Sequence, residues 1–292
     1  MDIQNFLNEE LEWLETYLTC SWADKSLSYT LSEADFKNYL NFFKDLVEIS
    51  DKISMDFFYK QNDIPSTIKD DGSFVTEADK EIEKSLRQLI SERFPGHSIL
   101  GEEEGESSSQ DEDFRWIIDP IDGTHGFMRG LPIWATLIAL EHDGTIIASI
   151  VSAPALGSRW WAGIGHGAYK SFNGNEFKIK SSTVNSISDA QMLYTGIKES
   201  TEKWPGFTKL LNSVWRERGL GDFWGHCLVA EGGSEIMIDP IVNIWDVAAL
   251  YLIVNESGGI MTDESGDLGY TSGHAITSNS QMHKELIKLI NS

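Results

Sequence analysis

Apolar residues recur every three or four positions in three stretches near the start of the chain, a pattern that predicts amphipathic helices. The stretches are residues 3–18, 36–57 and 75–89. Ser32 and Asp35 precede the second stretch at the spacing of a helix-capping box. Thr76 and Asp79 have the same spacing at the start of the third, so local capping alone accounts for their positions.

Runs of β-branched and aromatic residues between polar turns predict strands in the segment that follows. The expected strands cover residues 98–100, 116–118, 133–141, 145–151, 158–161 and 176–180. Asp143-Gly144 and Asn173-Gly174 are dipeptides typical of tight hairpin turns. The acidic tail from Gly105 to Asp113 is expected to be a solvated loop. Together these patterns favour helices packed on an antiparallel sheet.

The rest of the chain alternates helical and extended patterns, which favours an α/β layer. The expected order is a helix at 201–217, a loop at 221–224 entering a helix at 227–230, a strand at 235–239, a helix at 244–257, strands at 259–262 and 275–278, and a last helix capped by Ser280. Gly258 and Gly259 are expected to end the helix that precedes them.

Composition and charge narrow the class of protein. The 292 residues, 41% of them hydrophobic, are enough for one large domain or two closely packed halves. A net charge of −23 repels nucleic acid and anionic membrane surfaces. Cys20 and Cys227 are too few for a disulfide framework, and there is neither a signal-peptide pattern nor an apolar run approaching ~20 residues. We therefore expect a cytoplasmic protein that binds neither nucleic acid nor membranes.

The segment Trp116–Phe127 carries the strongest chemical signal in the chain. Three apolar residues lead into Asp119 and Asp122, and the proline between them restrains the backbone so that both carboxylates can point into one pocket. Gly123 leaves room for a ligand, and a helix starting near Thr124 would offer free N–H groups to an anion. Carboxylates beside an anion site indicate divalent metal ions and a phosphate ester. An ordinary turn with an acidic cap would use the same residue types.

Two more acidic positions stand at the ends of expected elements. Glu102 and Glu103 follow the strand at 98–100, and Asp246 opens the helix at 244–257. A solvated charge run would explain the glutamates, and a helix-dipole interaction, worth under ~1 kcal/mol, would explain Asp246. Neither explains why three acidic sites all lie at element ends, where functional groups gather in α/β folds.

Four motifs, in chain order, resemble the inositol monophosphatase family of metal-dependent phosphatases. They are Val75-Thr-Glu-Ala-Asp79, Gly101-Glu-Glu103, Asp119-Pro-Ile-Asp-Gly-Thr124 and Trp245-Asp-Val-Ala-Ala249. The resemblance begins near Phe36 and implies an α+β fold, the layered α/β/α/β/α sandwich of inositol monophosphatases and fructose-1,6-bisphosphatases. The implied parts are a helical extension at 1–35, helices plus an antiparallel sheet with most metal ligands at 36–182, and an α/β half with the substrate-binding residues at 183–292.

By motif position, the resemblance implies two or three Mg²⁺ ions held by oxygen donors. Glu102, Asp119 and the carbonyl of Ile121 would hold one ion. Asp119, Asp122 and Asp246 would hold a second. Hard oxygen ligands of this kind are those that Mg²⁺ prefers.

The resemblance also implies roles in catalysis and assembly. Glu102 and Thr124 would orient the attacking water, and the backbone N–H groups of Gly123 and Thr124 would hold the phosphate. Some relatives have an acidic residue where this chain has Ser73, which leaves a third ion open. Relatives are commonly homodimers, and we expect the same here.

Within the family, the chain resembles the histidinol-phosphatase branch. The segments that carry this resemblance are Gly130–Thr136, Ser152–Pro154, Arg159–Ala162 and Gly221–Trp224. The implied reaction of histidine biosynthesis hydrolyses histidinol phosphate, a small phosphate monoester. Its ammonium group suits carboxylates and aromatic faces, and the candidate carboxylates are Asp222 and Asp239. Trp160, Trp161 and Trp224 are candidate aromatic contacts, although core packing explains them better.

Other functions remain open on the sequence alone. Inositol monophosphate and 3′-phosphoadenosine 5′-phosphate are alternative substrates, and the negative net charge argues against the nucleotide. An alternative of another class is a non-catalytic protein that keeps the fold and binds cations or a partner. The complete set of implied site residues favours the enzyme.

Overall fold

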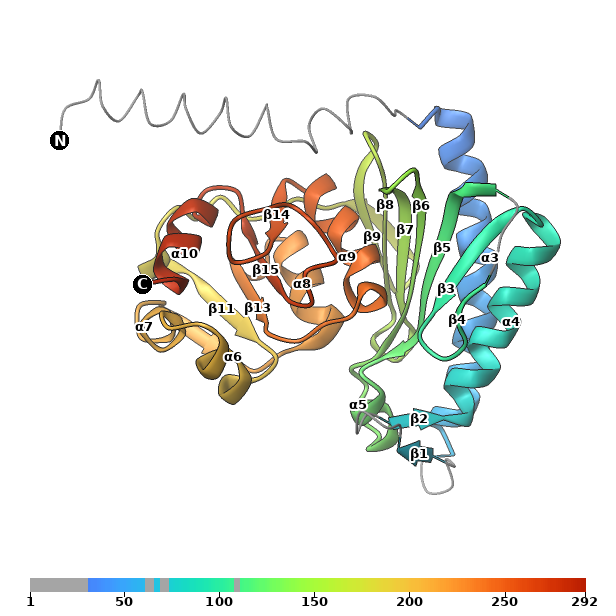
Figure 1. Ribbon diagram of the computed structural model, residues 1–292, viewed down its shortest axis with the longest axis horizontal. Helices are drawn as coiled ribbons and strands as arrows, with labels where there is room; N and C mark the ends of the chain where they lie inside the picture. The colour runs from blue at the N-terminus through green and yellow to red at the C-terminus, as the bar shows by residue number, and fades with distance from the viewer. Residues whose placement is uncertain (1–30, 61–65, 69–73, 108–110) are drawn as a thin grey trace.

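The computed structural model describes residues 31–60, 66–68, 74–107 and 111–292. Two β-sheets are separated by one layer of helices and covered on their outer faces by others (Figure 1). This is the α/β/α/β/α sandwich that the resemblance implied, so the fold prediction is confirmed. The expected helix at 3–18 and the position of Ser73 lie outside the described residues.

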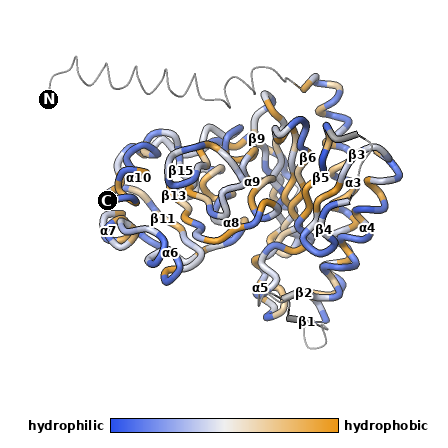
Figure 2. Tube along the Cα trace, in the orientation of Figure 1, coloured by the Kyte–Doolittle hydropathy of each residue, from blue (hydrophilic) through white to orange (hydrophobic). Residues whose placement is uncertain are grey.

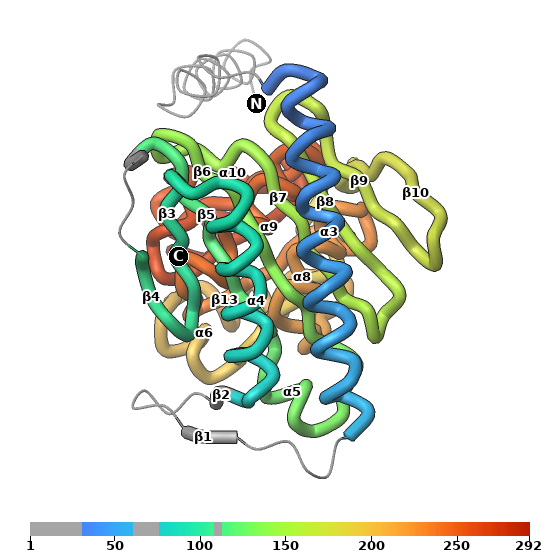
Figure 3. Tube along the Cα trace, turned by 90° about the vertical axis from the view of Figure 1, so that its right-hand side faces the viewer, coloured from blue at the N-terminus to red at the C-terminus, as the bar shows by residue number. Residues whose placement is uncertain are grey.

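Helices α3 (Glu33–Phe58) and α4 (Glu77–Arg93) lie side by side on the outer face of the larger sheet (Figure 3). Each is amphipathic and begins where the sequence predicts. The Ser32 side chain caps α3, and Thr76 with Asp79 forms a full capping box on α4. The backbone ahead of α4 forms a small hairpin of β1 (Ser66–Ile68) and β2 (Phe74–Thr76).

The larger sheet has eight strands in the order β10-β9-β8-β7-β6-β5-β3-β4. Their bounds are β3 His97–Gly101, β4 Gly105–Glu106, β5 Asp111–Asp122, β6 Ala135–His142, β7 Thr145–Ala153, β8 Ser158–Gly163, β9 Gly167–Phe172 and β10 Asn175–Lys178. The prediction of an antiparallel sheet is wrong for one pair, because β3 and β5 run parallel. Apolar residues concentrate in the central strands (Figure 2).

Both predicted hairpin turns are confirmed, with positive φ angles at Asp143, Gly144, Asn173 and Gly174. The second turn joins β9 to β10, and β9 was missed by the sequence analysis. The prediction of a solvated loop at 105–113 is wrong at both ends. Gly105 and Glu106 pair with β3, and β5 already begins at Asp111.

The middle layer consists of α8 (Asp222–Ala230) and α9 (Ile244–Glu256). Helix α9 contacts five strands of the larger sheet on one side and β14 (Gly259–Thr262) of the smaller sheet on the other. Burial between two sheets explains why its sequence is apolar nearly all round. The prediction of a loop at 221–224 is wrong, because α8 starts at Asp222, whose φ of 55° is in the left-handed region.

The smaller sheet has five strands in the order β12-β11-β13-β15-β14. The strands not yet bounded are β11 Gln191–Tyr194, β12 Arg216–Arg218, β13 Ile236–Asp239 and β15 Ala275–Asn279. Strand β11 lies parallel to both neighbours, whereas β15 is antiparallel to β13 and β14. Helices α6 (Ile197–Lys203), α7 (Phe207–Leu211) and α10 (His283–Ile290) form the outer layer (Figure 1).

The predicted helix at 201–217 is wrong, because the chain forms α6, α7 and the edge strand β12 there. Pro205 disfavours helical backbone at the residue before it, and Trp204 is indeed extended. The predicted cap of the last helix by Ser280 is also wrong, because α10 begins at His283 and its N-cap residue, Met282, has no side-chain capping hydrogen bond. The side chain of Asn279 accepts a hydrogen bond from the Met282 backbone at 3.3 Å, ahead of the helix.

Candidate active site

Strand β5 presents Asp119 and Asp122 on one side of its end because of an irregularity in its pairing with β6. Asp119 lies opposite Leu137 and Asp122 opposite Ala135, so β5 has one more residue than its partner between these pairs. Residues three apart on a regular strand face opposite sides, and one extra residue brings them to the same side. The buried Thr136 hydroxyl donates to the carbonyl of Pro120 at 2.8 Å and fixes this bulge.

Helix α9 brings a third carboxylate to the same place. Asp246 lies in its first turn and accepts a hydrogen bond from the Asn243 backbone at 2.7 Å. One carboxylate oxygen from each of Asp119, Asp122 and Asp246 lies within 4.8 Å of the others. These three oxygens are close enough together to bind one metal ion.

The parallel pairing of β3 and β5 places Glu102 beside these acids. Gly101 at the end of β3 is in register with Ile118, so Glu102 is the neighbour of Asp119. The Glu102 backbone N–H donates to the Ile118 carbonyl at 3.2 Å. The negative charge of Glu102 raises the pKa of Asp119, second only to the effect of burial.

The protein alone does not balance this concentration of negative charge. Burial raises the pKa of Asp119 and of Asp122 well above the usual range, and neighbouring carboxylates raise both further. Burial likewise raises the pKa of Asp246 to about 7. The buried Oδ1 of Asp119 has no hydrogen-bond partner in the described part of the chain. A buried oxygen of this kind, among acids that repel one another, fits a bound cation.

The turn after β5 leads into the one-turn helix α5 (Thr124–Met128). Gly123 precedes it with φ 84°, and a side chain at this position would meet the Ile133 carbonyl at 2.9 Å. The Thr124 hydroxyl donates to the carbonyl of Ile121 at 2.9 Å. Its oxygen therefore faces any further neighbour as an acceptor.

Glu83 of α4 holds the turn that carries Glu102. Its buried carboxylate accepts the backbone N–H groups of Glu103 at 2.7 Å and Glu104 at 3.0 Å. Arg87 pairs with the same carboxylate at 2.8 Å and donates to the Gly105 carbonyl. A side chain on Gly101 would collide with the Glu83 carboxylate, so glycine allows this close approach.

We expect Glu83→Gln to weaken Mg²⁺ binding, because an amide has one acceptor oxygen for the two backbone N–H groups and removes the charge that pairs with Arg87 at 2.8 Å. The expected result is a roughly tenfold higher Mg²⁺ concentration for half-maximal activity, equivalent to one lost hydrogen bond to a charged group. Lys80, an exposed partner of Glu77 on the same helix, offers the control Lys80→Gln, which should change nothing. An unchanged Mg²⁺ requirement in folded Glu83→Gln would contradict this role.

Asp222 and Asp239 line a cavity of about 60 Å³ next to the acid cluster. Asp122, Asp246 and His226 of α8 also line it. Burial raises the pKa of Asp222 to about 6, with Asp239 adding to the effect. The left-handed backbone at Asp222 is followed by the Phe223 N–H, which donates to Asp122 at 2.7 Å.

The three candidate tryptophans do not line this cavity. Trp160 is fully buried, donates to Glu231 at 3.2 Å and packs against Phe223. Trp161 is buried and stacks on Tyr169. Core packing, the interpretation preferred from the sequence, is confirmed for both.

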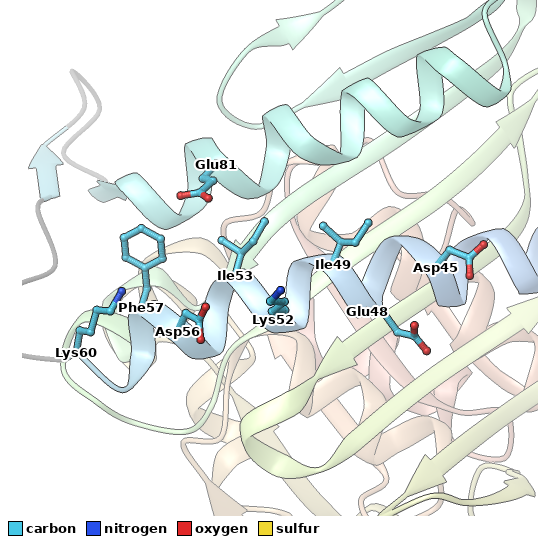
Figure 4. Close-up of a pocket in the computed structure, with 9 residues that line it drawn as sticks. All are labelled: Asp45, Glu48, Ile49, Lys52, Ile53, Asp56, Phe57, Lys60 and Glu81. Atoms are coloured by element: carbon cyan, nitrogen blue, oxygen red, sulfur yellow. The ribbon is translucent and has the colours of Figure 1, made fainter.

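A larger cavity of about 750 Å³ lies on the outer surface between α3 and α4 (Figure 4). Its acidic and basic side chains, which include Glu48, Lys52 and Glu81, are exposed to solvent. Solvent-exposed side chains of both charges balance one another and are hydrated, so they do not require a bound ion. We therefore assign the site to the smaller cavity and the acids beside it.

Two residues of this region were not recognised from the sequence. Asp79 was left as a local cap, yet burial together with Glu103 and Glu102 raises its pKa to about 7, so it belongs to the same acidic region. The signal in the sequence was the motif Val75-Thr-Glu-Ala-Asp79, which is part of the family resemblance. Glu83 had no signal beyond helical spacing, because its partners are backbone groups about twenty positions away.

Comparison with known proteins identifies the family to which this group of acidic residues belongs. The model of the inositol monophosphatase family matches residues 42–292. The chain belongs to this family. It is therefore a phosphatase, a phosphoric monoester hydrolase, as the sequence motifs predicted. The match begins within α3, at residue 42, so the family fold includes most of that helix.

Relatives within the family include enzymes of known name. The chain is 40% identical over 234 residues to the histidinol-phosphatase of Mycobacterium tuberculosis, covering 78% of this chain and 89% of that one. It is 39% identical over 264 residues to the histidinol-phosphatase of Streptomyces coelicolor, covering 88% and 98%. Among solved structures, the inositol monophosphatase (IMPase) of Thermotoga maritima superposes with a TM-score of 0.77 at 29% identity, covering 87% and 97%.

Proposed function

We propose that this phosphatase hydrolyses histidinol phosphate to histidinol and phosphate. The observation that carries the proposal is the acidic cavity beside the acid cluster. Asp222 and Asp239 line this cavity, and they suit a leaving group with a positive charge. The similarity to two histidinol-phosphatases at 39–40% identity supports the same substrate.

The residues present fit two or three Mg²⁺ ions. The donor set consists of carboxylates and one carbonyl, the hard oxygen ligands that Mg²⁺ takes. The unpartnered Oδ1 of Asp119 is the observation that supports a bound cation. Glu102, Asp119 and the Ile121 carbonyl would hold one ion, and Asp119 with Asp122 and Asp246 a second. When bound, the ions supply positive charge for the phosphate and for the oxygen of the leaving group.

The protein's own groups position the reactants. Thr124 Oγ1, whose proton is directed at Ile121, can accept a hydrogen bond from the attacking water, and the Glu102 carboxylate can accept a second. The backbone N–H groups of Gly123 and Thr124 lie beside the acids and would hold phosphate oxygens. These groups are already fixed in the absence of substrate. The bulge in β5, helix α9 and the turn held by Glu83 position them, which lowers the entropic cost of the reaction.

The test compares two substrates with the same phosphate. We expect Asp222→Asn and Asp239→Asn each to lower kcat/KM for histidinol phosphate about ten- to a hundredfold, because a charge-assisted hydrogen bond is worth roughly 1.5–3 kcal/mol. The loss on glycerol 2-phosphate, which has no amine, should be much smaller. Asp143→Asn in the exposed β6–β7 turn is the control. Equal losses on both substrates would assign these acids to the metal site or the fold.

Inositol monophosphate is the second candidate substrate, favoured by the superposition on the Thermotoga maritima enzyme. A polyol has hydroxyl groups and no charge, so it gains less from two carboxylates. A wild-type preference for inositol monophosphate over histidinol phosphate would establish this alternative.

We further propose that the protein is a homodimer and that it acts in the cytoplasm. No helix in the described ranges is long and apolar enough to cross a membrane. The net charge of −23 disfavours nucleic acid and anionic lipid surfaces as partners. Size-exclusion chromatography with light scattering would test the oligomeric state.

A further inference from the structure

Two residues that line the cavity of about 60 Å³ each have a buried polar atom without a hydrogen-bond partner in the described part of the chain. The atoms are Oδ1 of Asp239 and Nε2 of His226. The two side chains are 7% and 1% exposed. A buried polar atom without a partner destabilises the fold, so a ligand that hydrogen-bonds to both atoms would remove that cost.

The other contacts of His226 determine what Nε2 can bind. Its Nδ1 lies 2.9 Å from the hydroxyl oxygen of Thr277, which is fully buried in β15. If Thr277 accepts from Nδ1–H, the neutral ring presents a lone pair on Nε2. Asp239 Oδ2 lies 3.9 Å from Nε2, beyond hydrogen-bond distance, so no direct bond between the two side chains competes with a ligand.

We propose that His226 is a specificity-determining residue that accepts an N–H of a primary ammonium group on the leaving group. Asp239 and Asp222 accept its other two N–H groups. The inference rests on the proposed function and extends it to a group of three acceptors. Three acceptors match the three donors of an alkylammonium ion, whereas a hydroxyl has only one proton to donate.

The small volume of the cavity supports an ammonium rather than a ring. About 60 Å³ holds a few atoms, whereas a six-membered polyol ring with its hydroxyl groups is considerably larger. The carboxylates of Asp122, Asp222, Asp239 and Asp246 line the cavity and place negative charge where an ammonium needs it. The imidazole of His226 adds an acceptor without adding another negative charge.

The test measures discrimination between histidinol phosphate and its deamino analogue, 3-(imidazol-4-yl)propyl phosphate. The quantity is the ratio of kcat/KM for the two esters. We expect His226→Leu to lower this ratio about tenfold, the loss expected for one hydrogen bond to a charged group. His226→Gln, which retains an acceptor, should recover most of the ratio. Thr277→Val should lower the ratio several-fold, because the ring is then free to carry its proton on Nε2.

His283 offers the matched control. It is a buried histidine next to the same sheet, but both of its ring nitrogens have partners, Thr262 and Ser278. His283→Leu should change both substrates equally and leave the ratio unchanged. An unchanged ratio in folded His226→Leu would overturn the proposal. A wild-type ratio near one would also overturn the ammonium site, whereas the absence of measurable turnover of histidinol phosphate would overturn the proposed function.

A measurement on the unmodified protein covers the case in which His226→Leu does not fold. Nitrogen-15 NMR of the histidine rings distinguishes the two neutral tautomers. We expect the His226 signals to report a proton on Nδ1 and an unprotonated Nε2 that shifts when histidinol is added. A proton on Nε2 in the complex with histidinol would exclude Nε2 as an acceptor and overturn the proposal.

Discussion

Asp119→Asn is expected to lower kcat roughly a thousandfold or more at saturating Mg²⁺ while the fold survives. Asp119 is the residue that both implied ion sites share, and several kcal/mol of charge stabilisation at the phosphate depend on those ions. Its carboxylate is 1% exposed and has one oxygen without a partner in the described ranges. An amide has the same shape but neither the charge nor the second acceptor oxygen.

The same substitution should have the opposite effect on the metal-free protein. Burial and the charges of Glu102, Asp122 and Asp246 raise the pKa of Asp119, which means that its ionised form destabilises the fold. Removing that charge relieves the repulsion, so Asp119→Asn in EDTA should unfold at the wild-type temperature or above it. Thermal unfolding followed by circular dichroism, with released phosphate as the activity readout, measures both effects.

Asp51→Asn provides the contrast. Asp51 of α3 is also largely buried, but it pairs with Arg159 at 2.6 Å and accepts a hydrogen bond from Ser152. Its loss should lower the melting temperature and leave the Mg²⁺ dependence of activity unchanged. Near-normal turnover in Asp119→Asn, or a Mg²⁺ requirement altered as much in Asp51→Asn, would contradict the assignment of the metal site.

Local rules in the sequence were sufficient where neighbours in the chain determine the structure. The Ser32 cap, the capping box at Thr76 and the glycine turns at 143–144 and 173–174 depend on residues within a few positions. The apolar pattern of α9 reports burial on both sides and needs no knowledge of its partners. The parallel β3–β5 pair was missed because both parallel and antiparallel central strands can be continuously apolar.

Errors arose where one residue or a distant contact overrides the local pattern. Pro205 interrupts an otherwise helical run, and the pattern of apolar residues did not reveal it. The start of α8 depends on the left-handed Asp222, which aims the Phe223 N–H at Asp122 about a hundred positions earlier. Positive φ at a non-glycine residue costs about 1–3 kcal/mol and persists where the surroundings enforce it. Such contacts follow from tertiary structure and have no signature in one sequence.

The buried acids should make the metal-free protein less stable as the pH rises, and bound metal ions should reverse this trend. Burial raises the pKa of Asp79 and Asp246 to about 7 and that of Asp222 to about 6, from 3.8. The folded protein therefore binds protons between about pH 4 and 7, where the unfolded chain has lost them. Stability linked to these groups is complete below about pH 4 and is lost as the pH rises through 6 and 7. In EDTA, the free energy of unfolding should thus be higher at pH 5 than at pH 8.

Adding millimolar Mg²⁺ should stabilise the protein most where the acids are ionised, because protons and metal ions compete for the same carboxylates. Binding to the folded state alone contributes about 2.7 kcal/mol at one hundred times the dissociation constant. The shift in melting temperature between EDTA and Mg²⁺ should therefore be large at pH 8 and small at pH 5, which inverts the pH trend of the metal-free protein. Calorimetric scans at both pH values, with Na⁺ at matched ionic strength as the control, measure it. An equal shift at both pH values would mean that Mg²⁺ binds away from the buried acids, and no shift at pH 8 would contradict a metal site at Asp119, Asp122 and Asp246.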